Sequence, residues 1–454
     1  MTGALSTDLY ELNMAASYLR RSMTGQATFS LFVRKLPPGR GFLVAAGLED
    51  CLRFLEEFSF TEQDLDYLRQ VQGYGEDTLR AFAGLRFTGD VWAVPEGRVV
   101  FAGEPVLEVT GPVAEAQLAE TMLLNHVTFQ TSVATKAARC VLAADGAQLV
   151  DFAFRRTQGT DAALAVARAS AIAGFTATSN VAAARRYGLR AAGTMAHSFI
   201  EAFGDEEEAF TAFAEDFPGM TTFLVDTYDT GRGVRAAISV ARRLRLPGPV
   251  GVRLDSGDLA ALARLARGLL DDAGLGEARI LASGSLDEYA IADLAAAGAP
   301  IDAYGVGTKM GVSADAPYLD SAYKLVDYDG RPVMKLSAGK VSAPGAKQAY
   351  RGAGGDVLAL REEPPPPGHE PLLLPVMRGG RRAAAEPLAA ARRRCRADLA
   401  WLPPAARALH APVPVPVQLS EPLRALRDRV ARDLRRRTRG EAGAGQANAS
   451  SAPG

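Results

Sequence analysis

The chain has 454 residues, which is enough for more than one domain and a sizeable hydrophobic core. Hydrophobic residues make up 48% and charged residues 23%, a globular balance that excludes bulk disorder and fibrous repeats. The 51 Lys and Arg residues balance the 52 Asp and Glu residues, so no overall charge attracts the chain to nucleic acid.

The cysteines and the N-terminus bear on the cellular compartment. Cys51, Cys140 and Cys395 are too few and too scattered for a disulfide framework or a CxxC metal site. The N-terminus lacks the basic-then-apolar layout of a secretory signal, and no run of 18 apolar residues suggests a membrane span. We therefore expect a cytoplasmic protein in a reducing compartment, without a membrane partner.

The first 114 residues combine helices and strands. Leucines and alanines recur at helical spacing over 1–25, which predicts a helix. Residues 26–45 alternate like two strands around a Pro-Pro-Gly-Arg-Gly turn. Residues 47–84 are amphipathic and predict helices, whereas 85–113 contain strand-length apolar runs between Pro and Gly turns. We therefore expect an α+β unit over 1–114.

From residue 115 to 320 the pattern is different. A long helix is predicted over 115–140, and short apolar runs then alternate with alanine-rich amphipathic helices. Apolar strands with helical connections predict a parallel sheet, and seven of them predict a (β/α) barrel of about seven strands, either complete or incomplete. The runs lie at 149–156, 175–180, 189–198, 222–230, 250–258, 279–287 and 301–308.

The C-terminal part, 321–437, begins with strand patterns and ends with two basic amphipathic helices, and a disordered tail is predicted over 438–454. Between Arg378 and Arg439 there are 16 Arg and five acidic residues, a net charge of +11 against −12 for the rest. An RNA- or membrane-binding role is therefore an alternative, but aromatic residues for stacking on bases are sparse there. We therefore favour the interpretation that the arginines lie on solvent-exposed helix faces and that the chain does not bind nucleic acid.

Polar or glycine residues end each apolar run of the predicted parallel sheet. Because the carboxyl ends of parallel strands meet at one rim, these residues are candidates for an active site. Ser, Thr, Asp and Asn are also favoured helix N-caps, so the polar residues after any single run could equally cap the next helix.

Three of these strand ends carry groups suited to a phosphate ester and a sugar. Arg253 is a planar cation suited to carboxylate or phosphate, and Asp255 and Asp258 could hold Mg²⁺ or accept ribose hydroxyls. The glycine turns SGS at 283–285 and GVGT at 305–308 open onto helices, where backbone N–H groups bind anions.

A histidine and an aromatic pair complete the candidates. His197 ends a run beside Ser198, with Glu201 four residues on as a group that could orient its ring. Phe152 and Phe154 alternate along a predicted strand and therefore face one side, next to Arg155. No GxSxG, Walker A or strand-linked GxGxxG motif is present, which argues against hydrolase, P-loop and Rossmann interpretations.

Nine ordered motifs, spread from about residue 5 to about 435, resemble those of nicotinate phosphoribosyltransferases, a family of type II phosphoribosyltransferases. They include TDLYELNMA (7–15), DFAFRRTQGTDAAL (151–164), ATSNV (177–181), GTMAHSF (193–199), VDTYDT (225–230), VRLDSGDL (252–259), ASGSLDE (282–288) and YGVGTKM (304–310). The AYKLVDY…PVMKLS stretch completes the set.

The resemblance implies an ATP-coupled ligase of NAD salvage that needs Mg²⁺. Its substrates would be nicotinate and phosphoribosyl pyrophosphate, and its products nicotinate mononucleotide and pyrophosphate. The family fold is an irregular α/β barrel with an α/β sandwich domain built from both chain ends. The family resemblance also implies a homodimer with shared active sites.

The resemblance also implies roles for individual residues. Tyr10 resembles the ring-stacking residue that one subunit supplies to the other, with Phe152 on the opposite ring face. Arg155 and Arg253 resemble ligands of the carboxylate and the diphosphate, His197 the histidine that ATP phosphorylates, and Asp255 the ribose-hydroxyl acceptor. The remaining matches are a 5′-phosphate cradle of Gly284, Ser285, Gly307 and Thr308 and the basic residues Lys324 and Lys335.

Two alternatives remain within this fold. The nicotinamide-using relative resembles the chain at the same motifs but carries an acid where this chain has Ser179, so Ser179 favours the acid substrate. A degenerate barrel that binds without turnover is the other, and the intact motifs argue against it.

Overall fold

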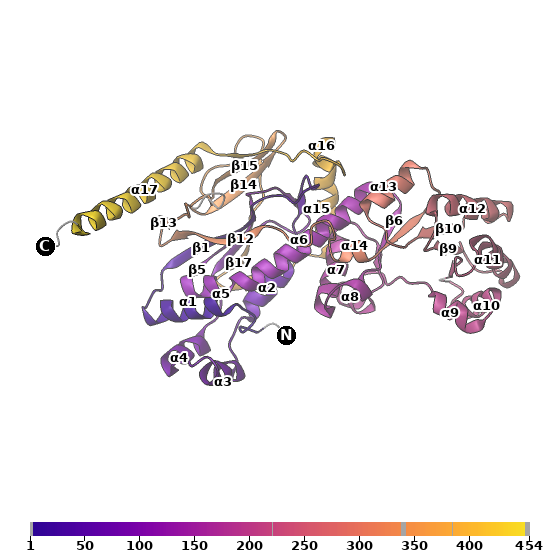
Figure 1. Ribbon diagram of the computed structural model, residues 1–454, viewed down its shortest axis with the longest axis horizontal. Helices are drawn as coiled ribbons and strands as arrows, with labels where there is room; N and C mark the ends of the chain where they lie inside the picture. The colour runs from indigo at the N-terminus through magenta and orange to yellow at the C-terminus, as the bar shows by residue number, and fades with distance from the viewer. Residues whose placement is uncertain (1–2, 220, 337–341, 384, 450–454) are drawn as a thin grey trace.

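The computed structural model describes residues 3–219, 221–336, 342–383 and 385–449, with side chains up to residue 437. The molecule is elongated, with antiparallel sheets at one end and a parallel sheet at the other (Figure 1). The long helix α6 (Glu120–Ala143) links the two parts and packs against helices of both. No helix in the described part of the chain is both long and apolar enough to cross a bilayer.

Strands from both ends of the chain form the largest sheet, which has seven strands in the order β13-β12-β1-β5-β3-β17-β18. At its centre β1 pairs antiparallel with β12 and β5, so that Leu31 lies opposite both Tyr323 and Leu107. The strands are β1 (Gln26–Val33), β3 (Asp90–Ala93), β5 (Pro105–Pro112), β12 (Ser321–Tyr328), β13 (Arg331–Pro332), β17 (Leu374–Arg378) and β18 (Arg381–Arg382).

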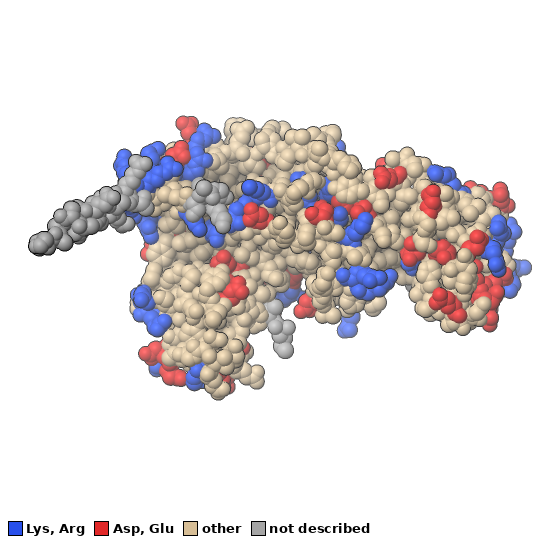
Figure 2. Space-filling view, viewed as in Figure 1, with Lys and Arg blue, Asp and Glu red and all other residues tan. Residues whose placement is uncertain are grey.

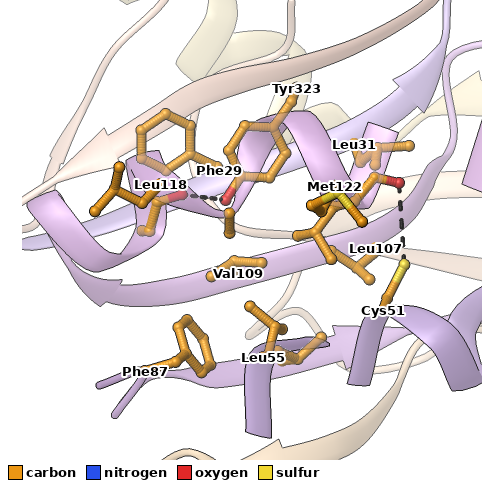
Figure 3. Close-up of a cluster of buried hydrophobic side chains, with 14 of the residues drawn as sticks. Phe29, Leu31, Cys51, Leu55, Phe87, Leu107, Val109, Leu118, Met122 and Tyr323 are labelled. Carbon is orange, nitrogen blue, oxygen red and sulfur yellow. Dashed lines mark hydrogen bonds between the residues drawn. The ribbon is translucent and has the colours of Figure 1, made fainter. Parts of the chain in front are cut away.

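Five helices belong to this end of the molecule, and their apolar faces build one core with the sheet (Figure 3). Phe29 stacks on Tyr323, whose hydroxyl donates to the carbonyl of Ala116 at 2.7 Å. Each fully buried side chain of this kind stabilises the fold by about 1.5–3 kcal/mol. The helices are α1 (Leu9–Arg20), α2 (Leu48–Glu57), α3 (Glu62–Gln70), α4 (Glu76–Gly84) and α5 (Val113–Leu118).

Two small sheets and three helices complete the antiparallel end. The four-stranded sheet has the order β16-β14-β15-β19, and β2 pairs with β4. The elements are β2 (Leu43–Val44), β4 (Val99–Val100), β14 (Lys347–Gly352), β15 (Gly355–Leu360), β16 (Glu370–Pro371), β19 (Val417–Leu419), α15 (Leu388–Trp401), α16 (Pro404–Arg407) and α17 (Glu421–Ala449).

Helix α17 projects from the body of the molecule (Figure 1). It continues through residues 438–449, where the composition predicts a disordered tail. Extending an existing helix costs much less than nucleating one, which accounts for helix in a glycine-containing segment. The last five residues, 450–454, lie outside the described part of the chain.

The parallel sheet has six strands in the order β7-β6-β11-β10-β9-β8, and helices connect its strands. The strands are β6 (Gln148–Asp151), β7 (Ala177–Thr178), β8 (Thr222–Leu224), β9 (Gly251–Leu254), β10 (Arg279–Ala282) and β11 (Ala303–Val306). The helices are η1 (Phe154–Arg156), α7 (Thr160–Ala173), α8 (Val181–Tyr187), α9 (His197–Phe203), α10 (Glu206–Asp216), α11 (Thr230–Leu244), α12 (Leu259–Asp272), α13 (Glu288–Ala296) and α14 (Thr308–Gly311).

The prediction of about seven strands is therefore wrong by one. The run at 189–198 forms a single bridge, between Ala191 and Thr178, and then crosses toward α9. A strand of a parallel sheet needs apolar side chains that are buried on both faces. Ala191, Ala192 and Gly193 offer little apolar surface, and none of them is buried. In the described residues β7 and β8 remain unpaired with each other, which leaves a half-barrel.

Candidate active site

The carboxyl edge of the parallel sheet gathers most of the predicted site residues. Phe152, Ser179, Asp255, Ser283 and Gly307 each follow directly after the last residue of a strand: β6, β7, β9, β10 and β11 respectively. The parallel register pairs Ala282 with Leu254 and Val306 with Asp151, so these ends lie level along the sheet. These residues therefore lie along one edge of the sheet.

Arg253 contacts several other residues of this rim. Its Nη2 donates to Asp255 Oδ1 at 2.7 Å, its Nε to Ser283 Oγ at 2.8 Å and its Nη1 to Thr194 Oγ1 at 3.1 Å. The guanidinium carbon lies 5.5 Å from the ring centroid of Phe152, within cation–π range. The side chain is 11% exposed, so a mostly buried fixed cation underlies the edge.

Asp255 presents a carboxylate that is held in its charged form. Burial by itself raises its pKa, but hydrogen bonds from Ser283 and Arg253, together with the charge of Arg253, lower the pKa below its ordinary value. Its backbone N–H donates to Asp226 Oδ2 at 2.8 Å, which links the ends of β9 and β8. The side chain is 30% exposed and thus accessible to a ligand.

His197 begins α9 and faces this carboxylate. Its Nδ1 lies 3.1 Å from Thr227 Oγ1, and its Nε2 lies 3.9 Å from Asp255 Oδ2. The ring is 40% exposed. Glu201, which the sequence singles out as a residue to orient the imidazole, is exposed, and the hydrogen-bond contact at Nδ1 comes from Thr227 instead. The imidazole is therefore oriented from the neighbouring strand end.

Two glycine positions shape the floor of the rim by their lack of a side chain. A Cβ at Gly284 would lie 2.0 Å from the carbonyl oxygen of Asp255, and its φ of +94° is itself unfavourable for other residues. A Cβ at Gly305 would lie 2.5 Å from the ring of Phe152. The next predicted cradle residues, Ser285 with a φ of +51° and Thr308, are exposed, and Gly307 is half-buried.

The acidic residues of these loops divide into two roles. In VDTYDT and RLDSGD the first acid, Asp226 or Asp255, faces the rim. The second acid, Asp229 or Asp258, accepts a backbone N–H at the start of α11 or α12 and acts as its N-cap. Asp258, which the sequence pairs with Asp255 as a Mg²⁺ ligand, is thus engaged as a helix cap and is exposed.

Metal binding is supported by a different carboxylate. No group of three or more His, Cys, Asp or Glu side chains in the described residues is arranged for a metal ion. Asp226 Oδ1, however, is buried without a hydrogen-bond partner among those residues, while Oδ2 accepts from Asp255 N–H and from Ser256 Oγ at 2.8 Å. Mg²⁺ takes one or two carboxylates together with phosphate oxygens, so Asp226 and Asp255 fit it.

The segment after β6 differs from the predicted strand. Phe154 and Arg155 lie in the short helix η1, so Phe152 and Phe154 do not alternate on one strand face. The carboxylate of Asp151 accepts from Thr178 Oγ1 at 2.7 Å and from Ala153 N–H at 2.8 Å, which turns the chain at this point. Phe152 stays at the rim, whereas Phe154 and Arg155 are exposed.

Tyr10, Lys324 and Lys335 lie away from this rim in the same chain. Tyr10 is on α1, 47% exposed, and contacts Glu120 and Glu11, whose charges add to burial in raising its pKa. Lys324 is on β12, and its charge lowers the pKa of the same Glu120, although burial raises that pKa overall. Figure 1 shows α1 and β12 at the opposite end of the molecule from β9 and β10. Lys335 is exposed beyond β13.

Three residues of the rim were not singled out from the sequence: Thr194, Asp226 and Thr227. Asp226 lies two residues and Thr227 three residues after the end of β8, so the rule that selected Asp255 could have selected them. Thr194 carries no such signal, because it belongs to the run that is not a strand.

Known protein families match most of the chain. The model of the nicotinate phosphoribosyltransferase N-terminal domain matches residues 5–128, and that of the C-terminal domain matches 365–427. Between them, the model of the quinolinate phosphoribosyl transferase C-terminal domain matches 133–320, which contains the half-barrel.

Individual proteins are similar over most of their length. Nicotinate phosphoribosyltransferase pncB2 of Mycobacterium tuberculosis is 55% identical over 350 residues, 77% of this chain and 75% of the relative. The nicotinate phosphoribosyltransferase of Bacillus subtilis is 45% identical over 379 residues, 79% of this chain and 76% of the relative. The crystal structure of human nicotinic acid phosphoribosyltransferase covers 93% of this chain and 99% of its own, with 32% identity and a TM-score of 0.81.

Proposed function

The chain belongs to the nicotinate phosphoribosyltransferase family and is an enzyme of NAD salvage from nicotinate, and from this premise we propose how its own residues perform the reaction. The reaction joins nicotinate to the ribosyl carbon of phosphoribosyl pyrophosphate and releases pyrophosphate. We propose in addition that it is coupled to hydrolysis of ATP and that two subunits build each site.

The observation that supports this assignment is the Arg253–Asp255–His197 group at the carboxyl edge of the half-barrel. Loss of pyrophosphate leaves positive charge on the ribose, which an ionised carboxylate such as Asp255 stabilises while it accepts ribose hydroxyls. Arg253 and the exposed Arg155 offer cations for the diphosphate and the nicotinate carboxylate. Phe152 offers one face for the pyridine ring, and Gly284, Ser285, Gly307 and Thr308 are the proposed cradle for the 5′-phosphate.

Product analysis tests the assignment. Purified protein is mixed with phosphoribosyl pyrophosphate, ATP, Mg²⁺ and one of nicotinate, nicotinamide or quinolinate; quinolinate is included because the half-barrel matches a quinolinate-transferase model. We expect nicotinate mononucleotide from nicotinate at a rate well above either other substrate. Faster turnover of quinolinate or nicotinamide would contradict the substrate assignment.

His197 is proposed to couple ATP to the reaction. One imidazole nitrogen attacks the γ-phosphorus, the bond to the ADP oxygen breaks, and water later releases the phosphate. The ring is exposed enough for this step and is held by Thr227, and the added charge of about −1.5 to −2 can order the cations of the rim. We expect His197→Ala to lose nicotinate-stimulated ATP hydrolysis but keep slow, ATP-independent synthesis.

Transfer of ³²P from γ-labelled ATP to the protein measures this coupling. Wild type should carry an acid-labile, base-stable label, and His197→Ala should carry none, with Ser198→Ala as the matched control that keeps it. A labelled and coupled His197→Ala enzyme would reduce His197 to a positioning residue.

Each site is proposed to be completed by the other subunit of a homodimer. The support is that α1 and β12, which carry Tyr10 and Lys324, lie at the opposite end of the molecule from β9 and β10 (Figure 1). Mixing inactive Tyr10→Ala and Arg253→Ala chains should restore up to about a quarter of the activity, because one site of each heterodimer regains both residues. No recovery under verified subunit exchange would exclude shared sites. Lys335, which is exposed, is proposed to act in the same way.

Asp255 and Asp226 are proposed as the residues that would hold Mg²⁺, which would supply charge neutralisation for the leaving diphosphate. Asp258 is proposed to serve as the cap of α12. Loss of activity in EDTA should be reversed by Mg²⁺, and Asp226→Asn should raise the Mg²⁺ concentration needed for half-maximal rate. An unchanged requirement would remove Asp226 from this site.

Ser179 is proposed to favour the acid substrate over the amide. It follows β7 directly, and its N–H donates to the carbonyl of Asp151 at 2.8 Å, beside the strand that carries Phe152. A carboxylate introduced by Ser179→Asp would repel the carboxylate of nicotinate. Nicotinate turnover should fall far more than nicotinamide turnover, and an equal fall would remove Ser179 from the specificity account.

Domain organisation and location follow as coarser proposals. We propose that 1–114 and 321–437 form one sandwich domain around the seven-stranded sheet and that 115–320 is the catalytic domain. A reducing cytoplasm suits the three cysteines, which are free and buried. The basic helices are proposed to be solvated faces, so retention on heparin should vanish in moderate salt without protection of RNA.

A further inference from the structure

A cavity of about 440 Å³ lies between the C-terminal ends of α6 and α7, one face of α15 and the end of α16. Val141 and Leu142 contribute from the end of α6, and Ala173 and Gly174 from the end of α7. Because helices of a (β/α) unit run back along the sheet, the end of α7 lies about 20 Å from its start near the rim. The volume falls in the range of roughly 300–1,000 Å³ of small-molecule sites.

The floor of the cavity is aliphatic. Leu399 and Ala400 of α15 join Val141, Leu142 and Ala173, and no aromatic side chain lines the cavity in the described residues. A flat heteroaromatic ring would find no aromatic side chain to stack on among these residues. A flexible hydrocarbon body matches this surface better, because burial of apolar area is non-directional.

Four arginines line the cavity, and no acidic residue among the described lining residues compensates their charge. Arg392, Arg393 and Arg396 of α15 and Arg407 of α16 line it, and no carboxylate among the described residues does. Arg392 donates to the carbonyl of Gly174 at 2.9 Å and so satisfies the end of α7. No ion pair in the described part of the chain joins Arg393, Arg396 or Arg407 to an acid.

The acids of the same helical segment are committed elsewhere. Glu386 pairs with Arg394, and Asp398 pairs with Arg98 at 2.9 Å and with Arg351 at 2.8 Å on the opposite, buried side of α15. Helix α15 thus sorts its charges: paired residues face the antiparallel sheets, and the arginines without acids face the cavity. Arg392 and Arg393 lie four and three residues before Arg396 on the same helix, so their positive charges repel one another unless an anion lies between them.

We propose that this cavity binds a small anionic amphiphile, in which a hydrocarbon chain fills the aliphatic floor and a carboxylate or phosphate contacts Arg393, Arg396 and Arg407. Such a site is separate from the nicotinate and phosphoribosyl pyrophosphate sites at the carboxyl edge of the sheet. A planar fork of donors on each guanidinium suits either head group.

Calorimetric titration of the full-length protein tests the proposal with four probes. Decanoate and decyl phosphate carry the two head groups, decanol has the chain without the charge, and inorganic phosphate has the charge without the chain. We expect saturable binding, with one site per chain, of at least one charged amphiphile. Decanol and inorganic phosphate should bind at least about tenfold more weakly, which corresponds to about 1.4 kcal/mol. The preferred head group identifies the source of the natural ligand.

Two pairs of variants locate the site. Arg393→Gln with Arg396→Gln should weaken the charged probe about tenfold or more, whereas Arg429→Gln with Arg432→Gln, on exposed positions of α17, should not. Ala400→Trp should fill the cavity and abolish binding, whereas Ala397→Trp, exposed on the same helix but outside the lining, should not. Circular dichroism checks that each variant is folded.

Three results would overturn the proposal. The first is binding of decanol as tight as that of the charged probes, which would make the cavity merely apolar. The second is unchanged affinity in both the Arg393/Arg396 and the Ala400 variants, which would place the ligand elsewhere. The third is the absence of saturable binding by either charged amphiphile.

Discussion

Two arginine–aspartate pairs in this molecule have the same chemistry and opposite surroundings. At the rim, Arg253 and Asp255 lie 2.7 Å apart. At the junction of the two halves, Arg40 and Asp315 lie 3.0 Å apart. Arg40 is completely buried and also donates to the carbonyl of Ser132 at 2.9 Å and to Ser313 Oγ at 2.7 Å. Its donors are therefore used within the protein.

The junction pair is one part of a larger buried network. Lys136 lies 2.9 Å from Asp315 Oδ1 and also pairs with Glu288, which accepts from Arg139 Nε at 2.9 Å. Burial raises the pKa of Asp315, but hydrogen bonds and charge from Arg40 and Lys136 outweigh it and hold that pKa far below its ordinary range. Every cation here has a carboxylate beside it, so the network holds α6, α13 and the loop of Arg40 together.

The rim differs because some of its carboxylate oxygens remain available to a ligand. Asp255 keeps an exposed face toward His197, and Asp226 has a buried oxygen without a hydrogen-bond partner in the described residues. An arginine–carboxylate pair therefore indicates a binding site only where hydrogen-bond acceptors or donors remain available to a ligand. Surface charge marks neither pair: in Figure 2 acidic side chains gather over α10 and basic side chains near α17, and neither pair belongs to these helices.

The largest expected effect comes from breaking the junction. Glu288→Ala leaves Arg139 buried without a carboxylate and Lys136 with Asp315 alone, which should lower the free energy of unfolding by about 3–5 kcal/mol. Urea denaturation measures it, and Glu201→Ala, an exposed glutamate, is the control. A loss no larger than that of the control would show that water solvates these charges.

Breaking the rim should instead affect catalysis. Arg253→Lys keeps the charge but cannot reach Asp255, Ser283 and Thr194 together, so kcat/KM should fall about 10²–10³-fold. The melting temperature should change little, because Asp255 becomes accessible to water. Arg264→Lys, exposed on α12, is the control for both measurements. Equal losses of activity in the two variants would contradict the role of the rim.

The floor of the rim offers a subtler test. Gly284→Ala meets both a positive φ and a Cβ contact of 2.0 Å with the Asp255 carbonyl, so it should cost about 1–3 kcal/mol and reduce kcat/KM. Gly274→Ala shares a positive φ of +72° but has nothing within 4 Å of its Cβ. It should cost about 1 kcal/mol and leave activity unchanged. Similar behaviour of the two would show that the close approach does not matter.

The smallest expected effect separates the two acids of the RLDSGD loop. Asp258→Ala removes the cap of α12 and should cost about 1 kcal/mol, whereas Asp258→Asn, which caps equally well, should cost almost nothing. Both should retain kcat/KM within about twofold, in contrast to Asp255→Asn. A large loss of activity in Asp258→Asn would return this residue to the Mg²⁺ site.

The sequence by itself determined which residues stand at the ends of the strands. Apolar runs that end in polar or glycine residues, such as those with Asp255 and Gly284, are local patterns, because a buried parallel strand must be apolar. The motifs that resemble the family also sufficed for the activity. They did not require knowledge of any contact between distant segments.

Only the tertiary structure decided which polar side chains face the rim and which cap a helix. Asp255 and Asp258 have the same chemistry three residues apart, and the pairing of β9 with β8 and β10 turns one toward the rim and leaves the other to cap α12. Likewise, the run at 189–198 forms one bridge instead of a strand, yet its Thr194 reaches Arg253. Strand pairing and side-chain direction depend on segments far apart in the chain, and local patterns carry no information about them.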